Sequence, residues 1–112
     1  MSKPKSKPPK PYQLFKQNYP EVGGTYEKLG EACHSAGPLD TKTREFIKMG
    51  IAIGASLESA THAHTRLALE AGATPDELRH VAILATTTLG FPTMMKSLVW
   101  VNETIEKQNK KK

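Results

Sequence analysis

Residues 64–78 read HTRLALEAGATPDEL, and this stretch decides how the chain folds. Its first eight residues carry apolar side chains at helical spacing, and Gly72 follows them as a stop signal. Thr74 and Pro75 then start a new helix, because threonine caps a helix N-terminus and proline suits the first helical position. The stretch therefore predicts a helix, a glycine hinge and a second helix.

The sequence on either side of this hinge shows the same helical spacing of apolar residues. We expect Asp40 or Thr41 to cap one helix and Ser56 to cap another. No stretch alternates polar and apolar residues for long enough to predict a strand. The predicted helices cover about residues 20–36, 41–55, 57–71, 75–89 and 93–107. The predicted fold class is all-α, a compact bundle of about five helices.

The net charge of +5 belongs to the two ends of the chain. Residues 1–17 contain five lysines and residues 107–112 contain four, with no acidic residue in either segment. Residues 18–106 therefore carry a net charge of −4. We expect residues 1–17 to form a disordered Pro/Lys-rich arm, residues 18–106 the helical domain, and residues 107–112 a basic tail.

Several classes of protein are disfavoured by composition. No apolar run approaches the roughly 18 residues that a membrane span needs, so we expect no membrane partner. Aromatic residues are not interleaved with basic ones, which makes nucleic acid an unlikely partner. The single cysteine, Cys33, fits a reducing, cytoplasmic location. Because 112 residues bury little on their own, we expect a homo-oligomer that shares an apolar helix face.

Two histidines on the predicted helix over residues 57–71 point to different faces. At about 100° per residue, His62 and His64 are roughly 200° apart and cannot ligate one metal ion. Glu58 and His62 share a face and can form a surface pair or half of a metal site. A metal would need a further ligand from elsewhere, for example His80 or Glu45. We expect no metal.

His64 has different neighbours, because it shares its helix face with small and apolar residues that include Leu57 and Ala60. Such a partly desolvated imidazole suits a general acid or base. A histidine with satisfied hydrogen bonds in the core is the alternative on residue pattern alone.

Four short motifs, in this order and at these spacings, resemble the carboxymuconolactone decarboxylase and alkylhydroperoxidase D-like family. They are Thr43-Arg44-Glu45, His64-Thr65-Arg66, residues 71–78 and Leu89-Gly90-Phe91-Pro92. The resemblance implies an all-α fold that assembles as trimers or hexamers, with the active site near the subunit contacts.

In the redox branch of that family, a glutamate, a CxxC motif and a histidine form a proton relay. The glutamate falls on Glu45 and the histidine on His64, but the two cysteine positions hold Leu57 and Ala60. Because neither residue supplies a thiolate, we expect no disulfide-relay peroxidase activity. We expect Cys33 to be a small core residue; an antioxidant protein that uses Cys33 is a weaker alternative.

The decarboxylase branch needs no cysteine, because a histidine beside a carboxylate can move the proton. The resemblance implies a cofactor-free lyase that decarboxylates or isomerises a small carboxylate or lactone, with Glu45 and His64 as the catalytic pair. The alternative is a non-catalytic oligomer that binds a small ligand or a protein. Residues expected to line the binding site are Leu57, Glu58, Ala60, His62 and Arg66.

Overall fold

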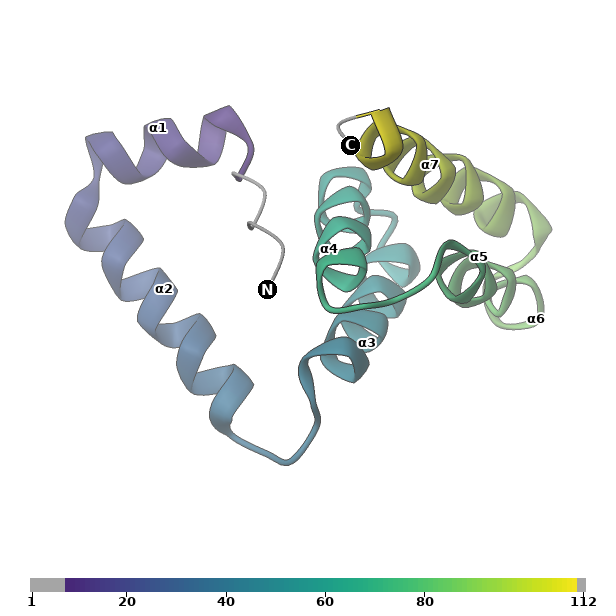
Figure 1. Ribbon diagram of the computed structural model, residues 1–112, viewed down its shortest axis with the longest axis horizontal. Helices are drawn as coiled ribbons and strands as arrows, with labels where there is room; N and C mark the ends of the chain where they lie inside the picture. The colour runs from purple at the N-terminus through teal and green to yellow at the C-terminus, as the bar shows by residue number, and fades with distance from the viewer. Residues whose placement is uncertain (1–7, 111–112) are drawn as a thin grey trace. The chain divides into compact units, whose positions relative to one another are not determined.

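The computed structural model describes residues 8–110, and every regular element within that range is an α-helix (Figure 1). This confirms the all-α prediction. The helices are α1 (Lys10–Asn18), α2 (Pro20–Ser35), α3 (Thr41–Gly54), α4 (Glu58–Glu70), α5 (Pro75–Ile83), α6 (Thr86–Leu89) and α7 (Phe91–Lys110). In the described part of the chain, no helix is both long and apolar enough to cross a membrane.

The chain divides into two compact units, and the first, up to Leu39, contains α1 and α2. The ring of Tyr12 meets Tyr26 edge-on at 6.5 Å between centroids, and Lys16 Nζ lies 2.8 Å from Glu27 Oε1. Helix α1 occupies most of residues 8–17, for which we expected a disordered arm. The composition of this segment gave no sign of these contacts with α2. Residues 1–7 of the expected arm lie outside the described residues.

The second unit, from Asp40 onward, packs α3, α4, α5 and α7 around one apolar core. Helix α4 contacts both α3 and α7, and α5 also contacts both of them. The core side chains include Met49, Ile53, Ala68, Leu78, Ala82, Met94, Val101 and Ile105. Residues 107–110, expected to belong to a tail, continue α7. The predicted bundle is therefore confirmed within this unit.

Buried threonines let α4 pack closely against its neighbours. Thr61 and Thr65 are fully buried, and each hydroxyl donates to the carbonyl four residues earlier, at 2.8 Å and 2.7 Å. These bonds satisfy both hydroxyls within the helix itself, so the two threonines need no polar partner from another helix.

The hinge between α4 and α5 has the predicted form. Gly72 adopts a φ of 99°, a conformation that glycine reaches without a steric penalty. Thr74 and Glu77 form a capping box: the Thr74 hydroxyl accepts from the Glu77 N–H at 3.1 Å, and the Thr74 N–H donates to the Glu77 carboxylate at 2.9 Å. Pro75 occupies the first turn of α5.

Two helix boundaries differ from the sequence prediction. Ser56 does not cap α4; its φ is 54°, and Leu57 takes the N-cap position without a side-chain hydrogen bond. The predicted helix over residues 75–89 is broken after Ile83. There the Thr86 hydroxyl donates to the Ile83 carbonyl at 2.6 Å, a bond that competes with the helical pattern.

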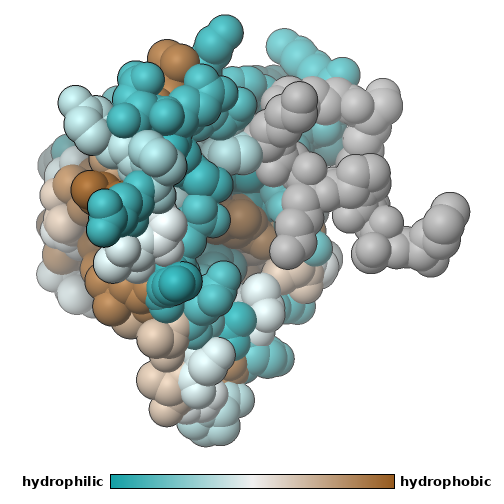
Figure 2. All heavy atoms as spheres, turned by 90° about the vertical axis from the view of Figure 1, so that its left-hand side faces the viewer, coloured by the Kyte–Doolittle hydropathy of each residue, from teal (hydrophilic) through white to brown (hydrophobic). Residues whose placement is uncertain are grey.

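Large apolar side chains also lie at the surface. Figure 2 shows brown, hydrophobic patches among teal, hydrophilic residues on one face of the molecule. In the second unit, exposed apolar residues include Ile47, Ile51, Leu84, Phe91 and Val99.

Candidate functional site

Glu45 and His64 lie side by side, although 19 residues separate them in the sequence. Their closest atoms, Glu45 Oε1 and His64 Nδ1, are 2.8 Å apart. Glu45 comes from α3 and His64 from α4, so the packing of these two helices forms the pair. The structure thus brings together the two residues that the resemblance singled out.

The two side chains differ in their access to solvent. The side chain of Glu45 is only 5% exposed, whereas that of His64 is 24% exposed. With Glu45 as a carboxylate, which can only accept, the Nδ1–H of His64 is the donor in this bond. A neutral imidazole held in this way carries its lone pair on Nε2. The arrangement can therefore orient a histidine for proton transfer through Nε2.

The helix pattern explains why Glu45 is buried. It lies on the same face of α3 as Met49 and Ala52, both of which are buried against neighbouring helices. A charged side chain on such a face needs a partner, because an unpaired buried charge is strongly destabilising. His64 supplies that partner.

The two positions that correspond to cysteines in the redox branch lie at the start of α4. Leu57 is about half exposed, and Ala60 is partly buried. The remaining cysteine, Cys33, lies on α2 and is exposed. The expectation that Cys33 is a core residue was wrong: it sits on a face of α2 whose residues are mostly at the surface.

Arg66 has a partner on its own helix. Its Nη1 atom lies 3.4 Å from Glu70 Oε2, one helical turn further along α4. This is the ion pair that a spacing of four residues allows.

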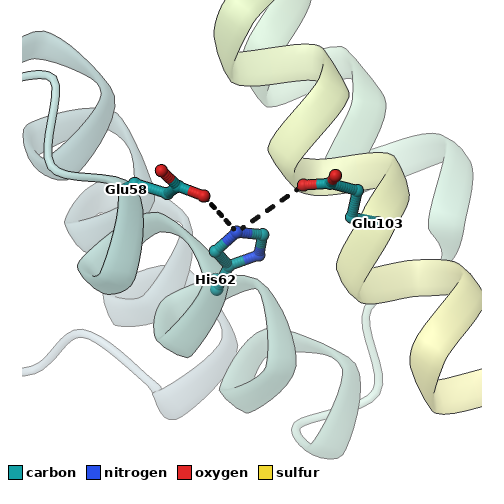
Figure 3. A group of neighbouring side chains, drawn as sticks. All are labelled: Glu58, His62 and Glu103. Carbon is teal, nitrogen blue, oxygen red and sulfur yellow. Dashed lines mark hydrogen bonds and ion pairs between the residues drawn. The ribbon is translucent and has the colours of Figure 1, made fainter.

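His62 takes part in a second constellation (Figure 3). Its Nε2 atom lies 3.4 Å from Glu58 Oε2 and 3.8 Å from Glu103 Oε1 on α7. Its Nδ1 atom lies 2.7 Å from the Thr104 hydroxyl. The sequence pattern paired Glu58 with His62 and offered His80 or Glu45 as a further ligand, but it gave no signal for Glu103.

The structure also contains an open pocket of about 530 Å³ on α3, α5 and α6. Neither Glu45 nor His64 lines it. The pocket and the acid–base pair are therefore separate features of the second unit. The lining of the pocket is mostly apolar and includes Phe46, Ile47, Ile53, His80, Leu84 and Leu89.

Comparison with known proteins identifies the family of this chain. The sequence profile of the carboxymuconolactone decarboxylase family matches residues 20–103. The chain belongs to this family. The match begins at α2, so it includes a helix of the first unit and nearly all of the second.

A solved structure of the carboxymuconolactone decarboxylase family shares the fold. It is the crystal structure of an apo protein of this family from Legionella pneumophila, with a TM-score of 0.71 and 24% sequence identity. The similarity covers 85% of this chain and 84% of that one. A comparison with curated proteins found no significant match.

Proposed function

We propose that this carboxymuconolactone decarboxylase family protein performs acid–base chemistry on a small carboxylate or lactone, by decarboxylation or isomerisation. The observation that carries the proposal is the 2.8 Å contact between His64 Nδ1 and the buried Glu45 carboxylate. His64 transfers the proton, and Glu45 fixes the ring and stabilises the imidazolium that forms. The chemistry needs no cofactor and no thiol.

In a decarboxylation, the bond between carbon and the carboxylate breaks and CO₂ leaves. The electron pair stays on the substrate carbon, and the imidazolium of His64 delivers the proton to that carbon through Nε2; the neutral ring then takes a proton from water before the next turnover. In an isomerisation, the same nitrogen removes a proton at one carbon and returns it at another. Either reaction uses one histidine in both of its protonation states.

We also propose that the protein acts in the cytoplasm as a homo-oligomer, a trimer or hexamer. Exposed apolar side chains in the second unit, such as Ile51 and Leu84, support assembly. A second copy would complete the surroundings of His64. The side chains proposed to adjust the binding site are those of Leu57, Glu58, Ala60, His62 and Arg66.

The test compares the wild type with the variant His64→Ala in the turnover of carboxymuconolactone. Turnover is measured as the rate of CO₂ release. We expect kcat to fall by roughly 10²- to 10⁴-fold, the usual contribution of a general acid or base. The circular dichroism spectrum should stay unchanged. A panel of small lactones and carboxylates extends the assay to isomerisation.

The matched control is His80→Ala, which removes an exposed imidazole that lines the pocket instead. This variant should retain wild-type turnover. Full turnover by His64→Ala would refute the proposal, and a loss confined to His80→Ala would move the chemistry to the pocket.

The separate apolar pocket favours a second candidate, a non-catalytic module that binds a small ligand. It predicts that an apolar probe such as anilinonaphthalene sulfonate binds the wild type and the variant Glu45→Gln equally well, while Leu84→Glu weakens binding. No turnover by the wild type, together with this binding pattern, would favour the module over the enzyme.

A further inference from the structure

The cluster of Glu58, His62 and Glu103 lies outside the Glu45–His64 pair to which the proposed proton transfer is assigned. Glu58 and His62 lie one turn apart on α4, and Glu103 lies on α7. Figure 3 shows both carboxylates directed toward the same nitrogen of the His62 ring. One candidate ligand atom from each residue lies within 4.8 Å of the other two. We propose that these three side chains bind a transition-metal dication, with Zn²⁺ as the best fit, which joins α4 to α7.

The distances suit ligands of one metal ion better than they suit hydrogen bonds. His62 Nε2 lies 3.4 Å and 3.8 Å from the two carboxylate oxygens, beyond the usual hydrogen-bond range of about 2.7–3.2 Å. Zinc binds nitrogen and oxygen at about 2.0–2.1 Å in a tetrahedron, which places neighbouring ligand atoms about 3.3–3.4 Å apart. Small side-chain rotations are enough to bring the three atoms to that separation.

Thr104 supplies an independent observation from outside the cluster. Its hydroxyl lies 2.7 Å from His62 Nδ1, and the residue is only 5% exposed. Metal-binding histidines commonly use their second ring nitrogen in such a bond, which fixes the orientation of the ring. When Nδ1–H donates to Thr104, the lone pair of Nε2 faces two carboxylates. A cation between these groups removes the resulting repulsion.

The chemistry of the ligands selects the ion. Imidazole nitrogen favours Zn²⁺ and similar transition-metal ions, whereas Mg²⁺ and Ca²⁺ prefer sites made of oxygen alone. The glutamate side chains are more than half exposed, so water can complete the coordination shell. The site lies on a different face of α4 from His64, and its role is to hold α4 and α7 together.

We expected no metal from the sequence, because Glu58 and His62 lacked a third ligand. Glu103 follows His62 by 41 residues, and only the packing of α4 against α7 brings it to the cluster. The third ligand that the sequence pattern lacked is therefore present in the structure, because two helices together contribute three candidate ligands.

The experiment is calorimetric titration of the full-length protein with ZnCl₂ in a non-chelating buffer near pH 7.5. We expect one Zn²⁺ per chain in the wild type. His62→Gln and Glu103→Gln should weaken binding by more than tenfold, and Thr104→Val by about tenfold. The matched controls are His80→Gln and Glu106→Gln, which remove an exposed imidazole and an exposed carboxylate outside the cluster and should bind Zn²⁺ as the wild type does.

A thermal unfolding series supplies a second measurement that does not depend on activity. Because an ion that binds only the folded state stabilises it, Zn²⁺ should raise the midpoint of the wild type but not that of Glu103→Gln. Binding that is absent at millimolar Zn²⁺, or equal in the wild type and Glu103→Gln, would overturn the proposal. A loss of stability in both cluster variants that is the same with and without Zn²⁺ would instead identify a contact between α4 and α7 that needs no metal.

Discussion

Glu45 is the residue whose surroundings differ most from those expected of its type. A glutamate that is 4% exposed would be destabilising without a charged or hydrogen-bonding partner, and His64 lies 2.8 Å away. Each member of the pair therefore determines what the other can do. The imidazole makes the buried carboxylate tolerable, and the carboxylate holds the imidazole in one orientation.

Substitution of Glu45 should separate these two effects. Glu45→Gln keeps the side-chain volume and can still accept a hydrogen bond from His64 Nδ1, so we expect this variant to fold. Its kcat should fall at least tenfold, because a neutral amide stabilises the imidazolium less than a carboxylate does. Glu45→Ala leaves a cavity and an unpaired ring nitrogen, and should lower the free energy of unfolding by about 1–3 kcal/mol. Chemical denaturation and the CO₂ assay measure the two quantities. Equal turnover by Glu45→Gln and the wild type would contradict the role given to this carboxylate.

Some contacts between single residues could be predicted from the sequence, and others could not. The pairing of Glu58 with His62 follows from a spacing of four in one helix. The contact between Glu45 and His64 joins two helices, and the family resemblance, not the residue spacing, pointed to it. Glu103 had no local signal at all, because no repeat or motif links α7 to α4.

At the scale of elements, carboxylates at helix N-termini make the stability of the folded state depend on pH. The Thr74 backbone N–H and the Lys42 ammonium hold the pKa of Glu77 below its ordinary value. At the start of α3, hydrogen bonds from Thr43 lower the pKa of Asp40. A carboxyl whose pKa is lower in the folded state stabilises the fold above its unfolded pKa, and that contribution disappears as pH falls through the folded value.

The expected outcome for Glu77→Gln follows from this sign. At pH 7 the variant should unfold at a lower temperature than the wild type, because it lacks the charge that faces the N-terminus of α5. The difference should shrink below about pH 4.5 and vanish once the wild-type carboxylate is protonated. Glu106→Gln, which removes a carboxylate that caps no helix, serves as the control. A difference that persists unchanged at pH 2 would contradict this account.

Element boundaries were predictable where the turn chemistry is strong. Gly72, Thr74 and Pro75 fixed the end of α4 and the start of α5 as expected. The prediction of a disordered arm missed α1, because the composition of this segment is typical of a disordered arm and its contacts with α2 have no signal in the sequence. The prediction of a helix cap failed at Ser56, where a residue with a good capping side chain takes a left-handed conformation instead.

At the scale of the whole molecule, the exposed apolar residues predict assembly. We expect native mass spectrometry to find a trimer or hexamer at micromolar concentration. Ile51→Glu or Leu84→Glu should lower the subunit number, because each places a charge on an exposed apolar side chain of the second unit. Asn109→Glu adds the same charge near the end of α7 and should leave the assembly intact. A monomeric wild type would contradict this expectation.

The small, fully buried residues on the inner face of α4 limit how a reactant of the proposed acid–base chemistry reaches His64. Thr61, Thr65 and Ala68 allow the neighbouring helices to close around α4, which leaves a reactant only the exposed quarter of the His64 side chain to approach. In the proposed oligomer, one protomer thus offers an imidazole edge, and a neighbouring protomer encloses the reactant. Specific activity would then depend on protein concentration: dilution below the dissociation constant of the oligomer would abolish turnover while every chain remained folded.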